Sequence, residues 1–135
     1  MSCCDINREQ KFFRCRYCGN FAGMIKFSGA LPICCDEPMQ ELVPNTVDAS
    51  AEKHVPVVTV EGDKVTVTVG SVLHPSLPEH HIEWIYLQTC CGGYRKCIEI
   101  GKETRVTFTL AEGDCPIAAF EYCNLHGLWK KDINK

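Results

Sequence analysis

Four cysteines in the first third of the chain have the types and spacing of a metal site. Cys15 and Cys18 form a CxxC motif, and the adjacent pair Cys34 and Cys35 follows sixteen residues later. Gly19 allows the close backbone approach that a CxxC turn needs. Four thiolates suit tetrahedral zinc or iron, and the spacing leaves that choice open. Because neighbouring side chains must splay to reach one ion, the adjacent pair predicts a strained tetrahedron.

Two alternatives apply to this cysteine group. A zinc ribbon would use the same four thiolates only to hold the segment together. Cys3 and Cys4 are also candidate ligands, but we expect them to lie in a frayed terminus and rank them lower.

A second group of metal-binding side chains lies further along the chain. Cys123 and His126 are three residues apart in a loop that ends at Gly127, which is a chelating spacing. Several imidazoles with one thiolate suit iron, zinc or copper. Two alternatives remain: an isolated histidine is more often a surface residue, and Cys123 could form a disulfide. A shared metal site would require distant loops to meet. The candidate histidines are His54, His74, His80, His81 and His126.

Short runs with β-strand character separate these candidates and must position them. Their alternation of apolar and polar residues predicts one buried and one solvated face, as in an antiparallel β-sandwich. A hairpin turn is expected at residues 61–63, and no helix with a cap and an apolar stripe is evident. His54 is expected to open the first of these strands. The predicted strands are residues 55–60, 64–69, 82–87 and 105–110.

Composition restricts the class of protein further. A net charge of −3 gives no basic footprint for nucleic acid, and no apolar run is long enough to cross a membrane. Eleven cysteines would fit a disulfide framework in a secreted protein, but the count is odd and the first ten residues lack an apolar signal core. We therefore expect a cytoplasmic protein in which some of the cysteines bind metal.

The change along the chain from a cysteine-rich segment to segments with alternating apolar and polar residues predicts two domains. Residues 1–43 hold six cysteines and few aliphatic alternations, so this segment needs a metal or a partner to fold. Residues 44–50 are polar and rich in turn formers, which favours a linker. Residues 51–135 carry the strands and form the expected sandwich domain.

The sequence resembles the desulfoferrodoxin family of superoxide reductases. Six segments carry this resemblance in order along most of the chain: 15–20 (CRYCGN), 34–39 (CCDEPM), 52–57 (EKHVPV), 70–75 (GSVLHP), 80–84 (HHIEW) and 121–127 (EYCNLHG). The resemblance implies a mainly β protein. A small rubredoxin- or desulforedoxin-like domain would precede an immunoglobulin-like sandwich.

The resemblance also implies two iron ions per chain. An auxiliary electron-transfer iron would be held by Cys15, Cys18, Cys34 and Cys35. The catalytic iron, which would reduce superoxide to hydrogen peroxide, would be held by His54, His74, His80 and His126 with Cys123 as axial ligand. His80 is preferred to its neighbour His81 because its spacing from His74 matches the family.

Further roles follow from the same resemblance. Lys53 would attract superoxide and help protonation, and Glu52 would ligate the ferric iron after turnover; the alternative for each is an ordinary exposed side chain. A rubredoxin-like carrier or a reductase would supply electrons, and the family implies a homodimer. Competing functions are a non-catalytic iron carrier or sensor and a zinc-stabilised interaction module. The cysteines without a family role are Cys3, Cys4, Cys90, Cys91, Cys97 and Cys115.

Overall fold

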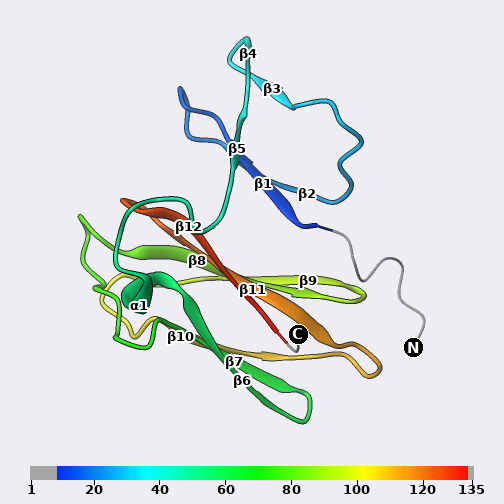
Figure 1. Cartoon of the computed structure of the whole chain (residues 1–135), viewed down its shortest axis with the longest axis vertical. Coiled ribbons are helices and arrows are strands. Elements are labelled where there is room, and N and C mark those ends of the chain that lie inside the picture. Colours follow the sequence, from blue (N-terminus) through cyan, green and yellow to red (C-terminus); the bar gives the residue numbers. More distant parts are fainter. Residues whose placement is uncertain (1–8, 134–135) are drawn as a thin grey trace. The chain divides into compact units, whose positions relative to one another are not determined.

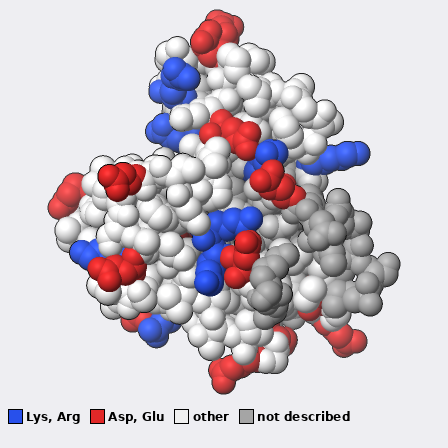
Figure 2. Space-filling view, in the orientation of Figure 1, with Lys and Arg blue, Asp and Glu red and all other residues white. Residues whose placement is uncertain are grey.

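The computed structural model describes residues 9–133 and divides them into two compact units, residues 9–43 and 44–133 (Figure 1). Cys3 and Cys4 lie outside the described residues. None of the helices in the described part of the chain is long and apolar enough to cross a membrane. Figure 2 shows acidic and basic side chains interspersed over the visible face, without one large patch of a single sign.

The first unit consists of two short antiparallel sheets. Among its described residues, one buried cluster consists of Phe13, Cys15 and Met39 with a few half-buried neighbours, and Phe12 is also buried. A core this small supplies little hydrophobic stabilisation, so the requirement for a metal remains a reasonable expectation. One sheet has the order β2-β1-β5 and the other pairs β3 with β4. The strands are β1 (Lys11–Arg14), β2 (Phe21–Met24), β3 (Ile33–Cys34), β4 (Glu37–Pro38) and β5 (Gln40–Leu42).

The second unit is an antiparallel sandwich of seven strands in two sheets, ordered β10-β7-β6 and β12-β11-β8-β9. Three plus four strands is the arrangement of an immunoglobulin-like sandwich. Inward-facing residues of both sheets, such as Val67, Leu87 and Phe108, form one buried core. The elements are α1 (Ala51–His54), β6 (Pro56–Glu61), β7 (Lys64–Val69), β8 (Ile82–Thr89), β9 (Gly92–Cys97), β10 (Arg105–Thr109), β11 (Pro116–Cys123) and β12 (Gly127–Asp132).

The mainly β fold expected from the sequence is confirmed. Strands β6, β7, β8 and β10 lie where the alternation placed them, and Glu61 pairs with Lys64 across the expected hairpin. Strand β11 was not predicted because it is central in its sheet and buried along most of its length, so its sequence does not alternate. Strands β9 and β12 were missed because glycines and charged residues interrupt their apolar pattern.

One expectation about local structure was wrong. His54 does not open a strand but ends α1, a single helical turn that precedes β6. The backbone of this turn packs closely on Gly70, where an added Cβ would lie 2.6 Å from the carbonyl oxygen of Glu52. The Glu52 carbonyl also accepts hydrogen bonds from the Val72 N–H and the Ser71 hydroxyl. The loop after β7 therefore holds α1 in place.

The segment expected to be a linker is attached to the sandwich by hydrogen bonds. The Asn45 N–H donates to the Leu128 carbonyl at 3.0 Å. The Asn45 side chain donates to the Lys130 carbonyl at 3.2 Å and accepts from its N–H at 2.8 Å. These bonds fix the entry of the chain into the sandwich against β12.

Candidate metal centres

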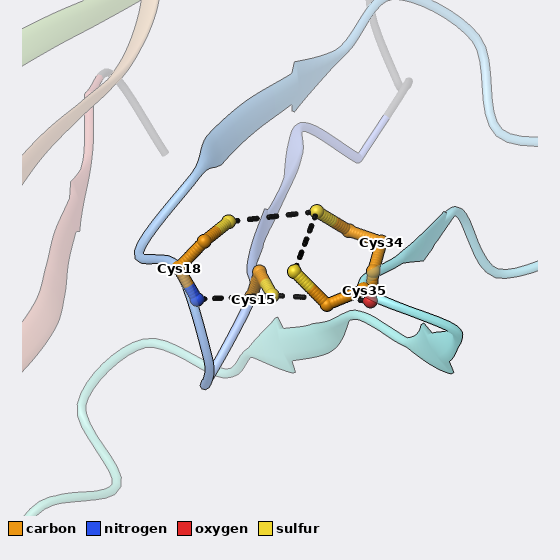
Figure 3. A group of neighbouring side chains, drawn as sticks. All are labelled: Cys15, Cys18, Cys34 and Cys35. Carbon is orange, nitrogen blue, oxygen red and sulfur yellow. Dashed lines mark hydrogen bonds between the residues drawn. The ribbon is translucent and has the colours of Figure 1, made fainter.

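The four cysteines of the first unit lie together, with their sulfur atoms pointing toward one another (Figure 3). All four sulfurs lie within 4.8 Å of one another. The Sγ–Sγ distance is 3.6 Å between Cys18 and Cys34 and 4.0 Å between Cys34 and Cys35. A metal–sulfur bond of about 2.3 Å in a tetrahedron gives an edge of about 3.8 Å. The geometry therefore fits one tetrahedral ion.

Backbone turns on both sides bring the thiols together. Gly19, in the loop between β1 and β2, has a φ of 81°, which only glycine adopts without strain. Cys35 and Asp36 form the two-residue loop between β3 and β4, and both have positive φ, of 54° and 63°. Positive φ at both positions is typical of a type I′ hairpin turn. Cys34 ends β3 and Cys35 begins the turn, so the reversal that starts at Cys35 brings the two adjacent sulfurs to one point. The strained tetrahedron stays a prediction.

Backbone and side-chain amides surround the same sulfurs. The Cys18 N–H donates to Cys15 Sγ at 3.5 Å, and the Asn20 N–H donates to Cys18 Sγ at 3.4 Å. The Cys18 N–H contributes most to lowering the pKa of Cys15 to about 6, whereas hydrogen bonds from the other thiols raise the pKa of Cys35 to about 12. Four adjacent thiolates repel one another, so full ionisation requires a cation. The donor set fits iron or zinc.

Four histidines of the sandwich form a nearly square ring. Neighbouring ring centroids are 4.6 to 5.1 Å apart, and neighbouring planes cross at 75° to 87°. The rings of His54 and His80, on opposite corners, are 6.4 Å apart and inclined by only 30°. Rings arranged in this way direct one nitrogen each toward a common centre. The corners in order are His54, His74, His80 and His126.

Hydrogen bonds to main-chain carbonyls orient two of these imidazoles. Nδ1 of His54 lies 2.7 Å from the Ser50 carbonyl, and Nδ1 of His74 lies 2.7 Å from the Pro75 carbonyl. Because a carbonyl only accepts, each Nδ1 carries the proton, and each Nε2 keeps its lone pair for a metal. The two Nε2 atoms face each other at 3.2 Å. Two such lone pairs in contact repel unless a cation lies near both.

The other two histidines complete the same centre. His126 presents Nδ1, which lies 3.1 Å from Nε2 of His54. Nε2 of His80 is buried and has no hydrogen-bond partner within the described residues. A buried polar atom without a partner is costly, and a metal ion would satisfy it. Burial is the main cause that lowers the pKa of His54 and His80, and it lowers the pKa of His74 to about 4. Lowered pKa values favour the neutral form of these three imidazoles, as ligation requires.

The sulfur of Cys123 lies under this ring, on the side of the sandwich core. Cys123 is fully buried, and its Sγ lies 3.4 Å from Nε2 of His74 and 3.9 Å from Nδ1 of His126. Backbone hydrogen bonds from Leu125 and His126 favour the thiolate, although burial has the larger effect and raises the pKa of the thiol. Binding of a cation would offset that desolvation cost. Four nitrogens and one sulfur therefore surround one point, and this donor set fits iron.

His81, the alternative to His80, points elsewhere. Its Nδ1 lies 3.0 Å from the Leu77 carbonyl, outside the ring of four. Its backbone N–H donates to Oδ1 of Asn124 at 2.9 Å, and the Asn124 amide donates to the Glu79 carbonyl at 3.1 Å. Asn124 thus fastens the loop that carries His80 to the turn that carries Cys123.

Sequence reasoning did not identify this role of Asn124, or the packing of Trp129 on His54. The Trp129 ring stacks on His54 at 5.0 Å, and its Nε1–H donates to the His126 carbonyl at 3.0 Å. The position of Asn124 between the candidate ligands Cys123 and His126 was the only sequence signal for its role in fastening the two segments. No local sequence pattern indicated that Trp129 packs on His54. Both residues hold ligand-bearing segments in position.

Glu52 and Lys53 lie on α1 and are exposed. The charge of Lys53 contributes to lowering the pKa of both His54 and His80, so it acts on the histidine ring. Within the described residues no side-chain hydrogen bond or ion pair of Glu52 links it to the ring. Their catalytic roles therefore stay predictions.

Replacing His80 with alanine should remove the metal of the second centre, because it deletes one corner of the ring of four imidazoles. Replacing the adjacent His81 with alanine is the matched control and should leave that metal bound. Metal analysis of the purified proteins measures both, with the four-cysteine centre as internal reference. Metal loss in the His81 variant alone would reverse the assignment.

Comparisons with known proteins agree with this geometry. The family model for desulfoferrodoxin matches residues 46–132. The desulfoferrodoxin of Syntrophotalea carbinolica is 41% identical over 120 residues, covering 89% of this chain and 94% of that protein. The superoxide reductase of Pyrococcus horikoshii is 39% identical over 105 residues, covering 64% of this chain and 90% of that protein.

A solved structure extends the similarity to both units. The crystal structure of the superoxide reductase from Treponema pallidum matches with a TM-score of 0.79 and 40% sequence identity, covering 93% of this chain and 100% of that chain. The family match covers more than half of the chain, and the identity to relatives extends over most of their length. This chain therefore belongs to the desulfoferrodoxin family.

Proposed function

We propose that this protein is a superoxide reductase that converts superoxide to hydrogen peroxide at the four-histidine, one-cysteine centre. The observation that carries the proposal is the buried Cys123 sulfur beneath a square of four imidazole nitrogens. The sulfur occupies the core side of the square. His80 and His126 are half-buried, so a small anion would approach from the side opposite the buried sulfur.

The reaction consumes one superoxide, one electron and two protons and yields one hydrogen peroxide. Iron in the centre would supply the electron by passing from the ferrous to the ferric state. Four neutral imidazoles and one thiolate offset only one of the two charges of a ferrous ion, so the donor set leaves a positive site that attracts an anion. The Cys123 thiolate donates electron density and thereby favours loss of the electron.

Charged residues of α1 would serve the open side of the centre. Lys53 follows Glu52 and precedes His54, so its ammonium lies close enough to affect the histidine ring. We propose that Lys53 draws superoxide toward the site and places a proton donor, or ordered water, beside it. Glu52 would place its carboxylate in the open position after turnover and so exclude other ligands.

The four-cysteine centre would serve as an auxiliary site for electron transfer. Amide hydrogen bonds order its residues, and its four thiolates would complete a tetrahedral ion and leave no position for substrate. We assign it to a desulforedoxin-like domain of residues 1–43, followed by a linker at 44–50 and a superoxide reductase domain at 51–135. A rubredoxin-like carrier or a reductase as electron donor, a homodimeric state and a cytoplasmic location complete the proposal.

Rapid mixing of the reduced protein with superoxide tests the proposed function. We expect about one hydrogen peroxide for each superoxide consumed and no dioxygen, because a reductase does not oxidise a second superoxide. The Cys15→Ser variant should lose the four-cysteine centre and still react in its reduced form. Dioxygen release would indicate a dismutase, and no reaction in either protein would favour a non-catalytic redox carrier or sensor.

Replacing Lys53 with alanine should slow the association of superoxide, because it removes one positive charge beside the centre. Iron should stay bound, because Lys53 is not one of its proposed ligands. We expect a decrease of up to about tenfold at low ionic strength and a smaller one at high salt, since salt screens exposed charges. Lys64→Ala, at the far end of β7, is the control and should have little effect. Lys53→Arg should restore the rate; equal rates in the wild-type and alanine proteins at low salt would exclude Lys53.

A further inference from the structure

A third cluster of metal-binding side chains lies in the sandwich, away from both centres described above. Cys90 and Cys91 directly follow β8, and Asp114 and Cys115 directly precede β11. Strands β8 and β11 pair side by side, with the histidine centre at their other end. Eight residues of β-strand separate Cys115 from Cys123, which corresponds to about 26 Å.

Three side chains of this cluster, those of Cys90, Cys91 and Asp114, converge as closely as those of the four-cysteine centre. The Cys90 and Cys91 sulfurs are 3.8 Å apart, and Cys90 Sγ lies 3.4 Å from Oδ1 of Asp114. One ligand atom each from Cys90, Cys91 and Asp114 lies within 4.8 Å of the others. The Cys115 thiol is not one of these three atoms; it lies beside the Cys90 thiol, and this contact contributes most to raising the pKa of Cys115 to about 11.

These distances match a tetrahedral ion with mixed ligands. Metal–sulfur bonds of about 2.3 Å and a metal–oxygen bond of about 2.0 Å give edges of about 3.8 Å between two sulfurs and about 3.5 Å between sulfur and oxygen. The observed separations of 3.8 and 3.4 Å agree with both. Two thiols and one carboxylate converge here, and a turn of the Cys115 side chain, whose thiol lies beside that of Cys90, would supply a fourth ligand. A mixed sulfur and oxygen set suits zinc better than copper(I), since copper(I) prefers sulfur alone.

Surrounding groups already fix the carboxylate and the two loops. Oδ1 of Asp114 accepts hydrogen bonds from the Cys91 N–H at 3.1 Å and the Cys115 N–H at 2.9 Å. The Tyr94 hydroxyl donates to Oδ2 at 3.4 Å, and the Cys90 N–H donates to the Cys115 carbonyl at 2.9 Å. Metal-binding carboxylates are commonly held by such outer hydrogen bonds. Little ordering would therefore be needed when an ion binds.

We propose that Cys90, Cys91, Asp114 and Cys115 form a third metal site, for a divalent ion of the zinc class. Cys90 is buried, Cys115 is half-buried and Cys91 is exposed, so an ion can enter from the Cys91 side. With Cys115 as the fourth ligand, all donors would come from the protein, which is typical of a structural rather than a catalytic zinc site. The ion would join the β8–β9 turn to the segment before β11 and close that end of the sandwich.

Zinc titration of the reduced, iron-loaded, full-length protein tests this site. We expect one additional zinc per chain with the iron content unchanged, measured by metal analysis after gel filtration and by competition with a chromophoric chelator. Zinc should also raise the thermal midpoint of unfolding, because it binds only the folded site. Binding only at millimolar zinc, or with loss of iron, would overturn the proposal.

Three variants separate ligation from folding effects. Cys91→Ser changes an exposed residue and should weaken zinc binding at least tenfold. Asp114→Asn should do the same, although its side-chain oxygen can still accept the two backbone hydrogen bonds. Cys97→Ser is the control, because Cys97 is exposed on β9, and its sulfur lies 3.0 Å from the Arg95 guanidinium rather than in the cluster.

Equal zinc affinity in the wild-type, Cys91→Ser and Asp114→Asn proteins would refute the site. A mass loss of about 2 Da under mild oxidation, together with no zinc binding by the reduced protein, would assign the cluster to a disulfide and would also refute it. Neither result would bear on the superoxide reaction, since the histidine centre shares no ligand with this cluster.

Discussion

A thiolate can remain under four imidazoles in an apolar core only if a cation lies between them. Cys123 is fully buried, and its neighbours include nitrogen atoms whose lone pairs face one another. Without a cation the cluster combines desolvation of the sulfur with lone-pair repulsion and an unpartnered nitrogen on His80. The rest of the sandwich has to offset this free-energy cost. Its rigid segments hold the five donors together and leave them no alternative arrangement.

The rigid segments come from different parts of the chain and meet at one end of the two sheets. The turn between β11 and β12 supplies Cys123 and His126, and α1 supplies His54. Close contact of α1 with Gly70 and the Asn124 clamp on the His81 segment fix the remaining loops. Hydrogen bonds of the backbone hold the segments that carry the four histidines and the cysteine. This explains how a small sandwich can position five metal ligands.

Much of this arrangement could be predicted from sequence, and the remainder depends on contacts that no local pattern encodes. Alternating valines indicated β7, and the CxxC motif with its adjacent cysteine pair indicated a four-thiol centre. The short helix at His54 was not predicted, because its position depends on packing against the loop at Gly70. Likewise, Cys90 and Cys115 had no assigned role, since only the pairing of β8 with β11 brings them together.

X-ray absorption at the iron edge of the reduced Cys15→Ser protein tests the central claim most directly. This variant should lack the four-cysteine iron, so the spectrum would report the histidine centre alone. The account predicts one sulfur and four nitrogen neighbours from the protein, and no sixth protein ligand in the reduced state. A spectrum without a sulfur neighbour, or with six tightly bound protein ligands, would contradict it.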